Sequence, residues 1–226
     1  MLNESIHYHN EELHIDGVSA QEIVQEIGTP TYIYSLRRVL RNLAHLRTAF
    51  SGLDAHIHYS AKANANLTLL RALVQQGVGI DCVSGGELYK ALAAGAPPAD
   101  LIFTGVGKRV DEIRYALENG VGWIDVENEG ELVHIKQLAS GIGREQVRLS
   151  LRLNPDVKAS THHHIATGHG KAKFGLTHDR AAQLLTEYAE DPVLRIEGIH
   201  VHVGSQLHDI EATVAAIQKA VDLIAP

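Results

Sequence analysis

The stretch GVGIDCVSGGELYKALAAGAPPADLIFTG, residues 77–105, contains a strand, a helix and a second strand in direct succession. GVGID at 77–81 leads into a short apolar segment of the length expected for a buried strand. Residues 87–94 have a helical pattern that stops at Gly95, and glycine commonly ends helices. LIFTG at 101–105 is again strand-like. A strand that reaches the next strand through a helix predicts a parallel pair.

The same cycle recurs on both sides of this stretch. A short strand is predicted at 31–35, TYIYS, ahead of a helix at 36–50. Helix caps are predicted at Asn66, at Asp111 and at Thr177 or Asp179. From about residue 56 the sequence predicts six β–α cycles, with strands near 56–61, 77–81, 101–105, 123–126, 147–153 and 195–204.

This alternation predicts an α/β fold of the (β/α)8 TIM type that stops after about six units. A complete barrel needs eight units and typically ~250 residues. The chain has 226 residues and ends at Pro226, inside or just after a predicted helix. A complete doubly wound sheet is the structural alternative. No strand is followed by a glycine-rich dinucleotide fingerprint, which disfavours that alternative.

The composition indicates one large globular domain in a reducing compartment. A net charge of −7 with neutral histidine argues against a general nucleic-acid or anionic-membrane binder. No apolar run approaches the ~18 residues of a membrane span, and the start MLNESIHYHN does not have the pattern of a secretory signal. Cys82, the single cysteine, excludes an intramolecular disulfide. We expect a cytoplasmic protein without nucleic-acid or membrane partners.

Polar residues with catalytic potential gather where the predicted strands end. In a parallel α/β barrel this edge carries the chemistry. Lys62 ends the first strand of the barrel within HYSAKAN (58–64), and His200 and His202 point the same way because side chains alternate along a strand. Such a set suits a phosphate-bearing cofactor. In chain order it comprises Lys62, Asp81, Ser84, Glu87, Thr104, Gly105, Arg152, Asn154, Lys173, His200, His202, Gly204, Ser205 and Gln206.

Each of these residues also has a purely structural explanation. A lysine at the end of a strand is usually a solvated loop residue. Asp81 and Glu87 flank a turn and fit a helix cap and a first-turn carboxylate. Two histidines on one strand face fit metal binding, core packing or stacking on a ring, and a metal site would need a further ligand. The functional prediction therefore rests on the combination.

Together these motifs resemble one family. HYSAKAN, DCVSGGE, LRLNPDV, KFG at 173–175 and GIHVHVGSQ occur in the order and context of the diaminopimelate decarboxylase family, which belongs to the alanine-racemase-like, fold-type III class of pyridoxal-phosphate enzymes. The resemblance covers nearly the whole chain and matches the N-terminal portion of such an enzyme. It implies a pyridoxal 5'-phosphate cofactor and conversion of meso-2,6-diaminopimelate to L-lysine and carbon dioxide, the last step of lysine biosynthesis. It also implies a small-molecule amino-acid substrate and a homodimer for the full-length enzyme.

The resemblance further implies roles for individual residues. Lys62 corresponds to the lysine that forms the Schiff base with pyridoxal phosphate, and His202 to the histidine stacked on the cofactor ring. These two residues are expected to be catalytic. Ser205 resembles a phosphate ligand. The expected cofactor-binding set is Lys62, Asp81, Glu87, Arg152, His200, His202 and Ser205.

Several later elements of the family do not follow Pro226. These are a GGG phosphate loop, an EPGR-like segment whose glutamate pairs with the pyridine nitrogen, and a CES-like segment whose cysteine is implicated in proton transfer. The resemblance implies that the last two barrel strands and the C-terminal β domain are absent. Residues 1–35 are then a segment that would join that β domain, and residues 36–226 form an incomplete cofactor-binding barrel. Whether the fragment is active by itself is left open.

Other functions stay open beside this one. A related decarboxylase would act on ornithine, arginine or carboxynorspermidine, although THHHIATGHGKAKFG (161–175) resembles the diaminopimelate pattern more closely. Alanine racemase fits less well, because NANLTLL follows the lysine motif here. A non-catalytic pyridoxal-phosphate-binding barrel would have about this length. A metal site at His162, His163, His164 and His169 is the third possibility, but three consecutive histidines in an extended chain cannot all face one ion, so we expect no metal.

Overall fold

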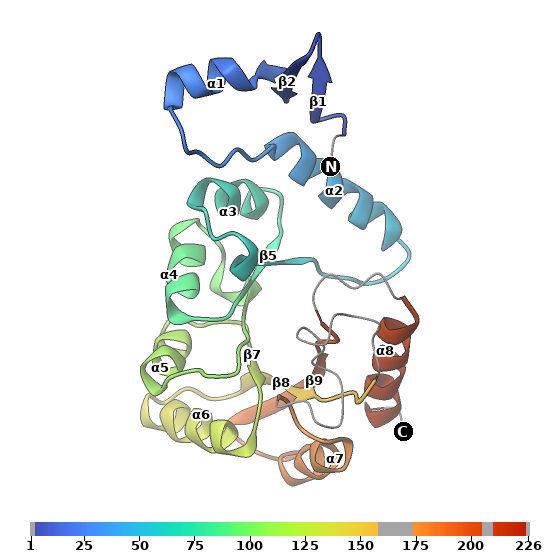
Figure 1. Cartoon of the computed structure of the whole chain (residues 1–226). Helices are drawn as coiled ribbons and strands as arrows, with labels where there is room; N and C mark the ends of the chain where they lie inside the picture. Colours follow the sequence, from blue (N-terminus) through green and yellow to red (C-terminus); the bar gives the residue numbers. More distant parts are fainter. Residues whose placement is uncertain (1–2, 158–173, 205–209, 225–226) are drawn as a thin grey trace. The chain divides into compact units, whose positions relative to one another are not determined.

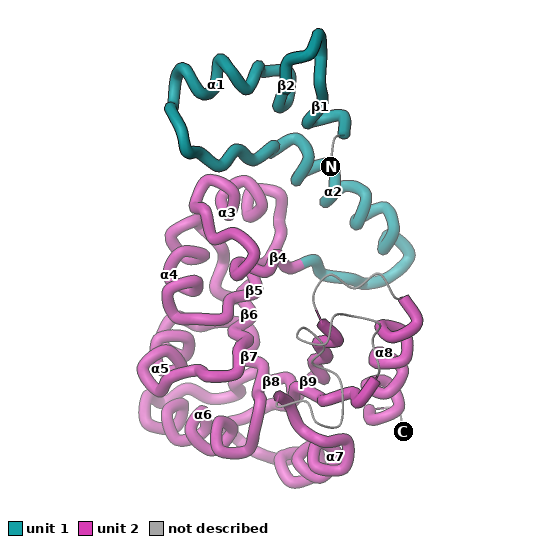
Figure 2. The backbone as a smooth tube through the Cα atoms, viewed as in Figure 1, with its two compact units in different colours: residues 1–57 teal, residues 58–226 magenta. Residues whose placement is uncertain are grey.

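The computed structural model describes residues 3–157, 174–204 and 210–224. The chain divides into two compact units, residues 1–57 and residues 58–226 (Figure 2). Within the described ranges, no helix combines the length and apolar character that a membrane span requires. The expected domain boundary after residue 35 stays a prediction.

The first unit combines a small antiparallel sheet with two helices (Figure 1). Strands β1 (Ile6–His9), β2 (Glu12–Ile15) and β3 (Val18–Ser19) pair in chain order. Each strand is joined to the next by two residues, which is a hairpin connection and explains the antiparallel pairing. Helices α1 (Ala20–Ile27) and α2 (Leu36–Ala49) complete the unit.

Two local predictions are wrong. TYIYS at 31–35 is not a strand: no described strand pairs with it, so its β-forming side chains have no ladder to join. Asp111 does not cap a helix. It lies inside α5 (Val110–Glu118), whose N-cap is Arg109, and the Glu112 carboxylate accepts a hydrogen bond from the Arg109 N–H at 3.0 Å.

The second unit is a parallel sheet of six strands connected by helices, which confirms the six predicted β–α cycles and the α/β class. The strands, paired in chain order, are β4 (His58–Ser60), β5 (Gly79–Cys82), β6 (Leu101–Phe103), β7 (Trp123–Val126), β8 (Val147–Leu153) and β9 (Leu194–Val201). The helices are η1 (Ala61–Ala63), α3 (Leu67–Val74), α4 (Gly85–Ala93), η2 (Pro98–Asp100), α5, α6 (Glu129–Gly141), α7 (His178–Glu187) and α8 (Ile210–Ile224). Among the described strands β4 pairs only with β5 and β9 only with β8, so these two are edges.

Side-chain caps fix where two of these helices begin, as predicted. The Asn66 side chain accepts a hydrogen bond from the Thr68 N–H at 2.9 Å and starts α3. The Thr177 hydroxyl accepts from the Arg180 N–H at 3.4 Å and starts α7. Each cap satisfies an N–H group that the helix itself leaves without a partner.

Alternation along the strands separates an apolar face from a polar one. Helices α3 to α6 follow one another along one side of the strands (Figure 1). The side chains packed in the core with these helices are apolar and almost fully buried: Ile80, Cys82, Leu101, Phe103, Ile124, Val126, Leu149 and Leu151. The intervening positions place Asp81, Asp125 and Ser150 on the opposite face. The sheet therefore carries a row of polar groups on the face turned away from the helices.

Candidate active site

A pocket of ≈ 540 Å³ opens at the carboxyl ends of the strands of the second unit. This volume is in the range of small-molecule sites. The lining comes from the ends of β4, β5, β6, β8 and β9 and from Phe174, which lies shortly before α7. Strand β7 contributes no lining residue. The pocket brings together five of the seven expected cofactor-binding residues: Lys62, Asp81, Arg152, His200 and His202. Thr104 and Gly105, two further members of the predicted polar set, also line it, together with Ser60, Val83, Val106, Gly107 and Phe174.

Glu87 does not line this pocket. It lies in the first turn of α4, where its carboxylate accepts a hydrogen bond from the Val83 N–H at 2.8 Å. The Glu87 N–H in turn donates to the Ser84 hydroxyl at 3.2 Å. The Ser84 hydroxyl thus caps the helix, and the Glu87 carboxylate binds the N–H of the residue before the cap, so the two bonds secure the helix start beside the pocket. A direct role of Glu87 at the cofactor stays a prediction.

Other predicted positions lie outside the described residues. They are Lys173, Ser205, Gln206 and the histidines at 162–164 and 169. Within the ranges that the structure describes, no group of three histidine, cysteine, aspartate or glutamate side chains is arranged to hold a metal ion.

Lys62 is held on a short turn directly after β4. The preceding residue, Ala61, is only 1% exposed and anchors the turn in the core. On the other side, the Tyr59 hydroxyl donates to the Asn64 carbonyl oxygen at 3.2 Å. The Lys62 side chain itself is exposed and lines the pocket. A fixed backbone with an accessible amine is the arrangement that a covalent attachment point for an aldehyde requires.

Two hydroxyls hold Asp81 in place at the pocket. The Ser60 hydroxyl donates to one carboxylate oxygen and the Thr104 hydroxyl donates to the other. Ser60 ends β4 and Thr104 follows β6, the two strands that pair with β5. The Asp81 carboxylate is therefore held by hydrogen bonds from both neighbouring strand ends. A carboxylate so held has little freedom to swing away from a ligand.

Two acidic residues of β7 and its end are functional candidates that the sequence reasoning missed. Asp125 and Glu127 are each only 6% exposed. The Ser150 hydroxyl donates to Asp125, and Nδ1 of His200 lies 2.9 Å from the other Asp125 oxygen. Glu127 accepts a hydrogen bond from Nη1 of Arg152 at 2.6 Å. Glu127 therefore contacts the pocket residue Arg152 on β8, and Asp125 contacts the pocket residue His200 on β9. Neither carboxylate lines the pocket itself.

Arg152 is fixed on two sides. Besides the Glu127 bond, its guanidinium lies over the Phe174 ring, 5.7 Å from the ring centre. The residue is 8% exposed, so the positive charge is largely removed from water and paired. Paired in this way, the guanidinium keeps one defined position at the pocket wall.

Opposing effects set the charge of the buried groups. Burial raises the pKa of Asp125, but the hydrogen bond and charge of His200, the Ser150 hydroxyl and the Lys108 charge outweigh it and hold this pKa below its usual value. Burial, together with the positive charges of Lys62, Arg152 and His200, lowers the pKa of His202 from 6.5 to about 4, although the Asp81 charge opposes this. The Asp125 carboxylate behind the pocket wall thus stays ionised, whereas the His202 imidazole in the wall stays neutral.

The low pKa of His202 predicts a loss of stability in mild acid. The folded protein resists protonation of this ring until about pH 4, whereas the unfolded chain takes up the proton near 6.5. The free energy of unfolding of the cofactor-free protein should therefore fall as the pH drops from about 6.5 toward about 4. Urea unfolding across this range would measure the decline. In His202→Gln it should be shallower, and an unchanged slope in that variant would assign the decline to other groups.

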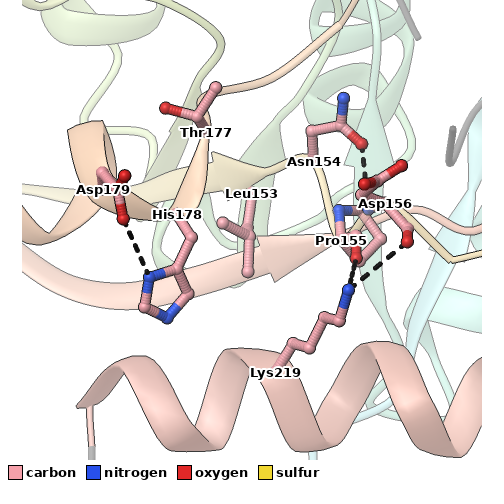
Figure 3. A pocket seen from close by; sticks show the side chains of 8 residues that line it. All are labelled: Leu153, Asn154, Pro155, Asp156, Thr177, His178, Asp179 and Lys219. Carbon is pink, nitrogen blue, oxygen red and sulfur yellow. Dashed lines mark hydrogen bonds and ion pairs between the residues drawn. The ribbon is translucent and has the colours of Figure 1, made fainter. Parts of the chain in front are cut away.

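A second pocket, of ≈ 500 Å³, lies between the end of β8, the start of α7 and α8, and Figure 3 shows it from close by. Nζ of Lys219 donates to the Pro155 carbonyl oxygen at 2.7 Å and to that of Asp156 at 3.3 Å. Nδ1 of His178 lies 3.8 Å from Oδ1 of Asp179. Asn154, a member of the predicted polar set, lines this pocket, but none of the expected cofactor-binding residues does. Its polar groups are already engaged with one another, which makes the first pocket the better candidate for catalysis.

The sequence of this chain is similar to those of known proteins of one family. Residues 36–225 match the family described as pyridoxal-dependent decarboxylase, pyridoxal binding domain. The diaminopimelate decarboxylase of Aquifex aeolicus is 42% identical over 222 residues, covering 98% of this chain and 52% of the relative. That of Pseudomonas aeruginosa is 39% identical over 217 residues, covering 96% of this chain and 52% of the relative.

A solved structure agrees with these matches. The diaminopimelate decarboxylase of M. jannaschii, crystallised with L-lysine, superimposes with a TM-score of 0.90 at 33% identity. The match covers 99% of this chain and 54% of that protein. The chain thus spans about half the length of the relatives that it matches.

Proposed function

Because the chain belongs to the pyridoxal-dependent decarboxylase family, we propose that it serves the decarboxylation of meso-2,6-diaminopimelate to L-lysine and carbon dioxide. The observation that carries this proposal is the single pocket that gathers Lys62, Asp81, Arg152, His200 and His202 at the carboxyl ends of parallel strands. The substrate follows from the relatives, which are named as diaminopimelate decarboxylases at up to 42% identity. The product is the ligand crystallised with the M. jannaschii relative.

The pocket fits pyridoxal phosphate by its donors and its shape. The accessible amine of Lys62 suits an aldehyde, and the nearby positive charge of Arg152 suits a phosphate or carboxylate. The neutral, flat ring of His202 suits stacking on an aromatic face, because it brings no charge that would have to be desolvated. We propose that these residues hold the cofactor, together with Asp81 and His200 and with Glu87 and Ser205 as expected from the resemblance.

The chemistry divides between cofactor and chain. Pyridoxal phosphate, when bound, supplies the electron sink that loss of carbon dioxide from an amino acid needs. Lys62 would supply the amine at which the cofactor aldehyde is attached. Asp81, fixed by Ser60 and Thr104, would place its carboxyl group at the bound cofactor in one defined position. His202 would lie against one face of the bound cofactor ring and exclude water from that face.

We also propose the domain assignment and the setting of the protein. Residues 1–35 would join a β domain, and residues 36–226 are the cofactor-binding part, which agrees with the family match beginning at residue 36. A homodimer and a cytoplasmic location are expected from the resemblance to this family. An amino acid is the proposed small-molecule partner, and the net charge of −7 supports the absence of nucleic-acid partners.

Carbon dioxide release tests the proposal. The purified protein, loaded with pyridoxal phosphate, is given carboxyl-labelled meso-2,6-diaminopimelate, and L-ornithine and L-arginine in parallel reactions. Release from diaminopimelate alone supports the proposal. Release from ornithine or arginine instead would assign the chain to a related decarboxylase. Cofactor absorbance without release from any of the three would indicate a non-catalytic pyridoxal-phosphate-binding protein.

A further inference from the structure

A belt of polar side chains crosses all six strands of the second unit. It takes one residue from each strand or its end: Ser60, Asp81, Thr104, Asp125, Ser150 and His200. Each residue from Ser60 to Ser150 contacts the next, and His200 contacts Asp125. The belt is nearly sequential because neighbouring strands in the sheet are also neighbours in the chain. Its two carboxylates, Asp81 and Asp125, both face the hydroxyl of Thr104.

The number of hydrogen atoms available for donation determines which hydrogen bonds this belt can form. A threonine hydroxyl has one hydrogen to donate. Thr104 makes its closer contact with Asp81, while its distance to Oδ2 of Asp125 is 3.2 Å. Oδ1 of Asp125 receives the Ser150 hydrogen. Oδ2 of Asp125 is therefore left with Nδ1 of His200, at 2.9 Å, as its nearer partner.

An ionised carboxylate oxygen next to a bare ring nitrogen would bring two lone pairs together. The low pKa of Asp125 keeps this carboxyl ionised. The contact meets the distance of an ion pair, although the N–H is not aligned as in a straight hydrogen bond. Electrostatic attraction at this distance in a buried site needs a hydrogen on Nδ1.

We propose that Asp125 is a positioning residue of the pocket: it holds His200 with the hydrogen on Nδ1 and so presents the remaining ring atoms to the ligand. Nδ1 is fully buried, yet the His200 side chain is 23% exposed and lines the pocket. The exposed part of the ring therefore consists of other atoms, Nε2 among them. Asp125 does not line the pocket itself and contacts two residues that do, His200 at 2.9 Å and Thr104 at 3.2 Å. The inference concerns the cofactor-free pocket and does not rest on the proposed reaction.

Nitrogen NMR of histidine-labelled, cofactor-free protein tests this assignment. The His200 signals are identified as those lost in His200→Gln. The wild-type spectrum should show a hydrogen on Nδ1 of His200. In Asp125→Asn the side-chain amide can donate to Nδ1, and the ring should change to the neutral form with its hydrogen on Nε2. Ser150→Ala is the matched control, because it removes another partner of Asp125 and should leave the hydrogen on Nδ1.

Three outcomes would overturn the proposal. One is a wild-type ring that is neutral with a bare Nδ1, a result that needs no variant to fold. Another is an Asp125→Asn protein whose His200 signals match those of the wild type. The third is the same change of tautomer in Ser150→Ala, which would trace the effect to general loosening of the belt. Since no cofactor or substrate is present, failure here would leave the decarboxylase proposal untouched.

Discussion

Replacing Glu131 by alanine is expected to lower the free energy of unfolding by about 3–5 kcal/mol, the usual cost of removing one partner of a buried ion pair. Nζ of Lys108 lies 2.7 Å from the Glu131 carboxylate, and the Lys108 side chain is completely buried. Its other partners are the carbonyl oxygens of Gly105, at 2.9 Å, and Asp125. Without Glu131, a buried ammonium group would retain only neutral acceptors.

The same substitution removes a second contact. The other oxygen of Glu131 accepts a hydrogen bond from the Glu127 N–H at 2.7 Å, and this group is buried. Losing it leaves the N–H of Glu127 without its partner, and Glu127 is the residue whose carboxylate binds Arg152. Stability and pocket geometry are therefore linked at this point of the sheet.

Chemical denaturation, followed by the fluorescence of the single tryptophan, Trp123 on β7, measures the effect. Glu129→Ala is the matched control: it lies in the same first turn of α6, but its ion pair with Arg180 is exposed, so the change should be small. Equal effects of the two substitutions would contradict the prediction. In the double variant Lys108→Met with Glu131→Leu, part of the lost stability should return, because no charge is then left unpaired.

Lys62→Ala is expected to abolish the visible absorbance band that appears when pyridoxal phosphate becomes attached to a lysine. The alanine side chain has no amine, so the covalent link cannot form at this position. Titration of the purified variant with the cofactor, followed by absorption spectroscopy, measures the loss. Lys62→Arg should also lack the band, although it keeps a positive charge in the pocket.

A lysine outside the pocket provides the control for this experiment. Lys90 is exposed on α4, and Lys90→Ala should retain the full band. A band of normal intensity in Lys62→Ala would show that another lysine carries the cofactor. That result would refute the assignment of Lys62 while leaving the fold assignment intact.

The sequence predicted the strand ends of the second unit because apolar runs and helical faces alternate clearly there. Asp81, Arg152, His200 and His202 could be placed at one edge from this order alone, since carboxyl ends of parallel strands meet. TYIYS at 31–35 failed because local β propensity does not show whether a partner strand exists.

The supporting residues were harder to predict because their roles depend on neighbouring strands. Asp125 stands within the apolar run WIDV, and burying a carboxylate there is costly unless donors surround it. A carboxylate inside an apolar strand was therefore the feature of the sequence that could have identified Asp125 as a candidate. The donors themselves, Ser150 and His200, lie 25 and 75 positions further along the chain (150 − 125 and 200 − 125), and only the pairing of β7, β8 and β9 brings them close. A purely local pattern does not contain this information.

Cys82 gives the chain a built-in reporter of motion. Its side chain packs in the core, and burial raises the pKa of its thiol to about 12, with Glu87 and Asp81 adding to the effect. Only a thiolate that meets solvent reacts readily with an alkylating reagent. Under native conditions, labelling of this one sulfur must therefore wait until β5 parts from its covering helices. Its slow kinetics would measure how often the sheet opens at the strand that carries Asp81.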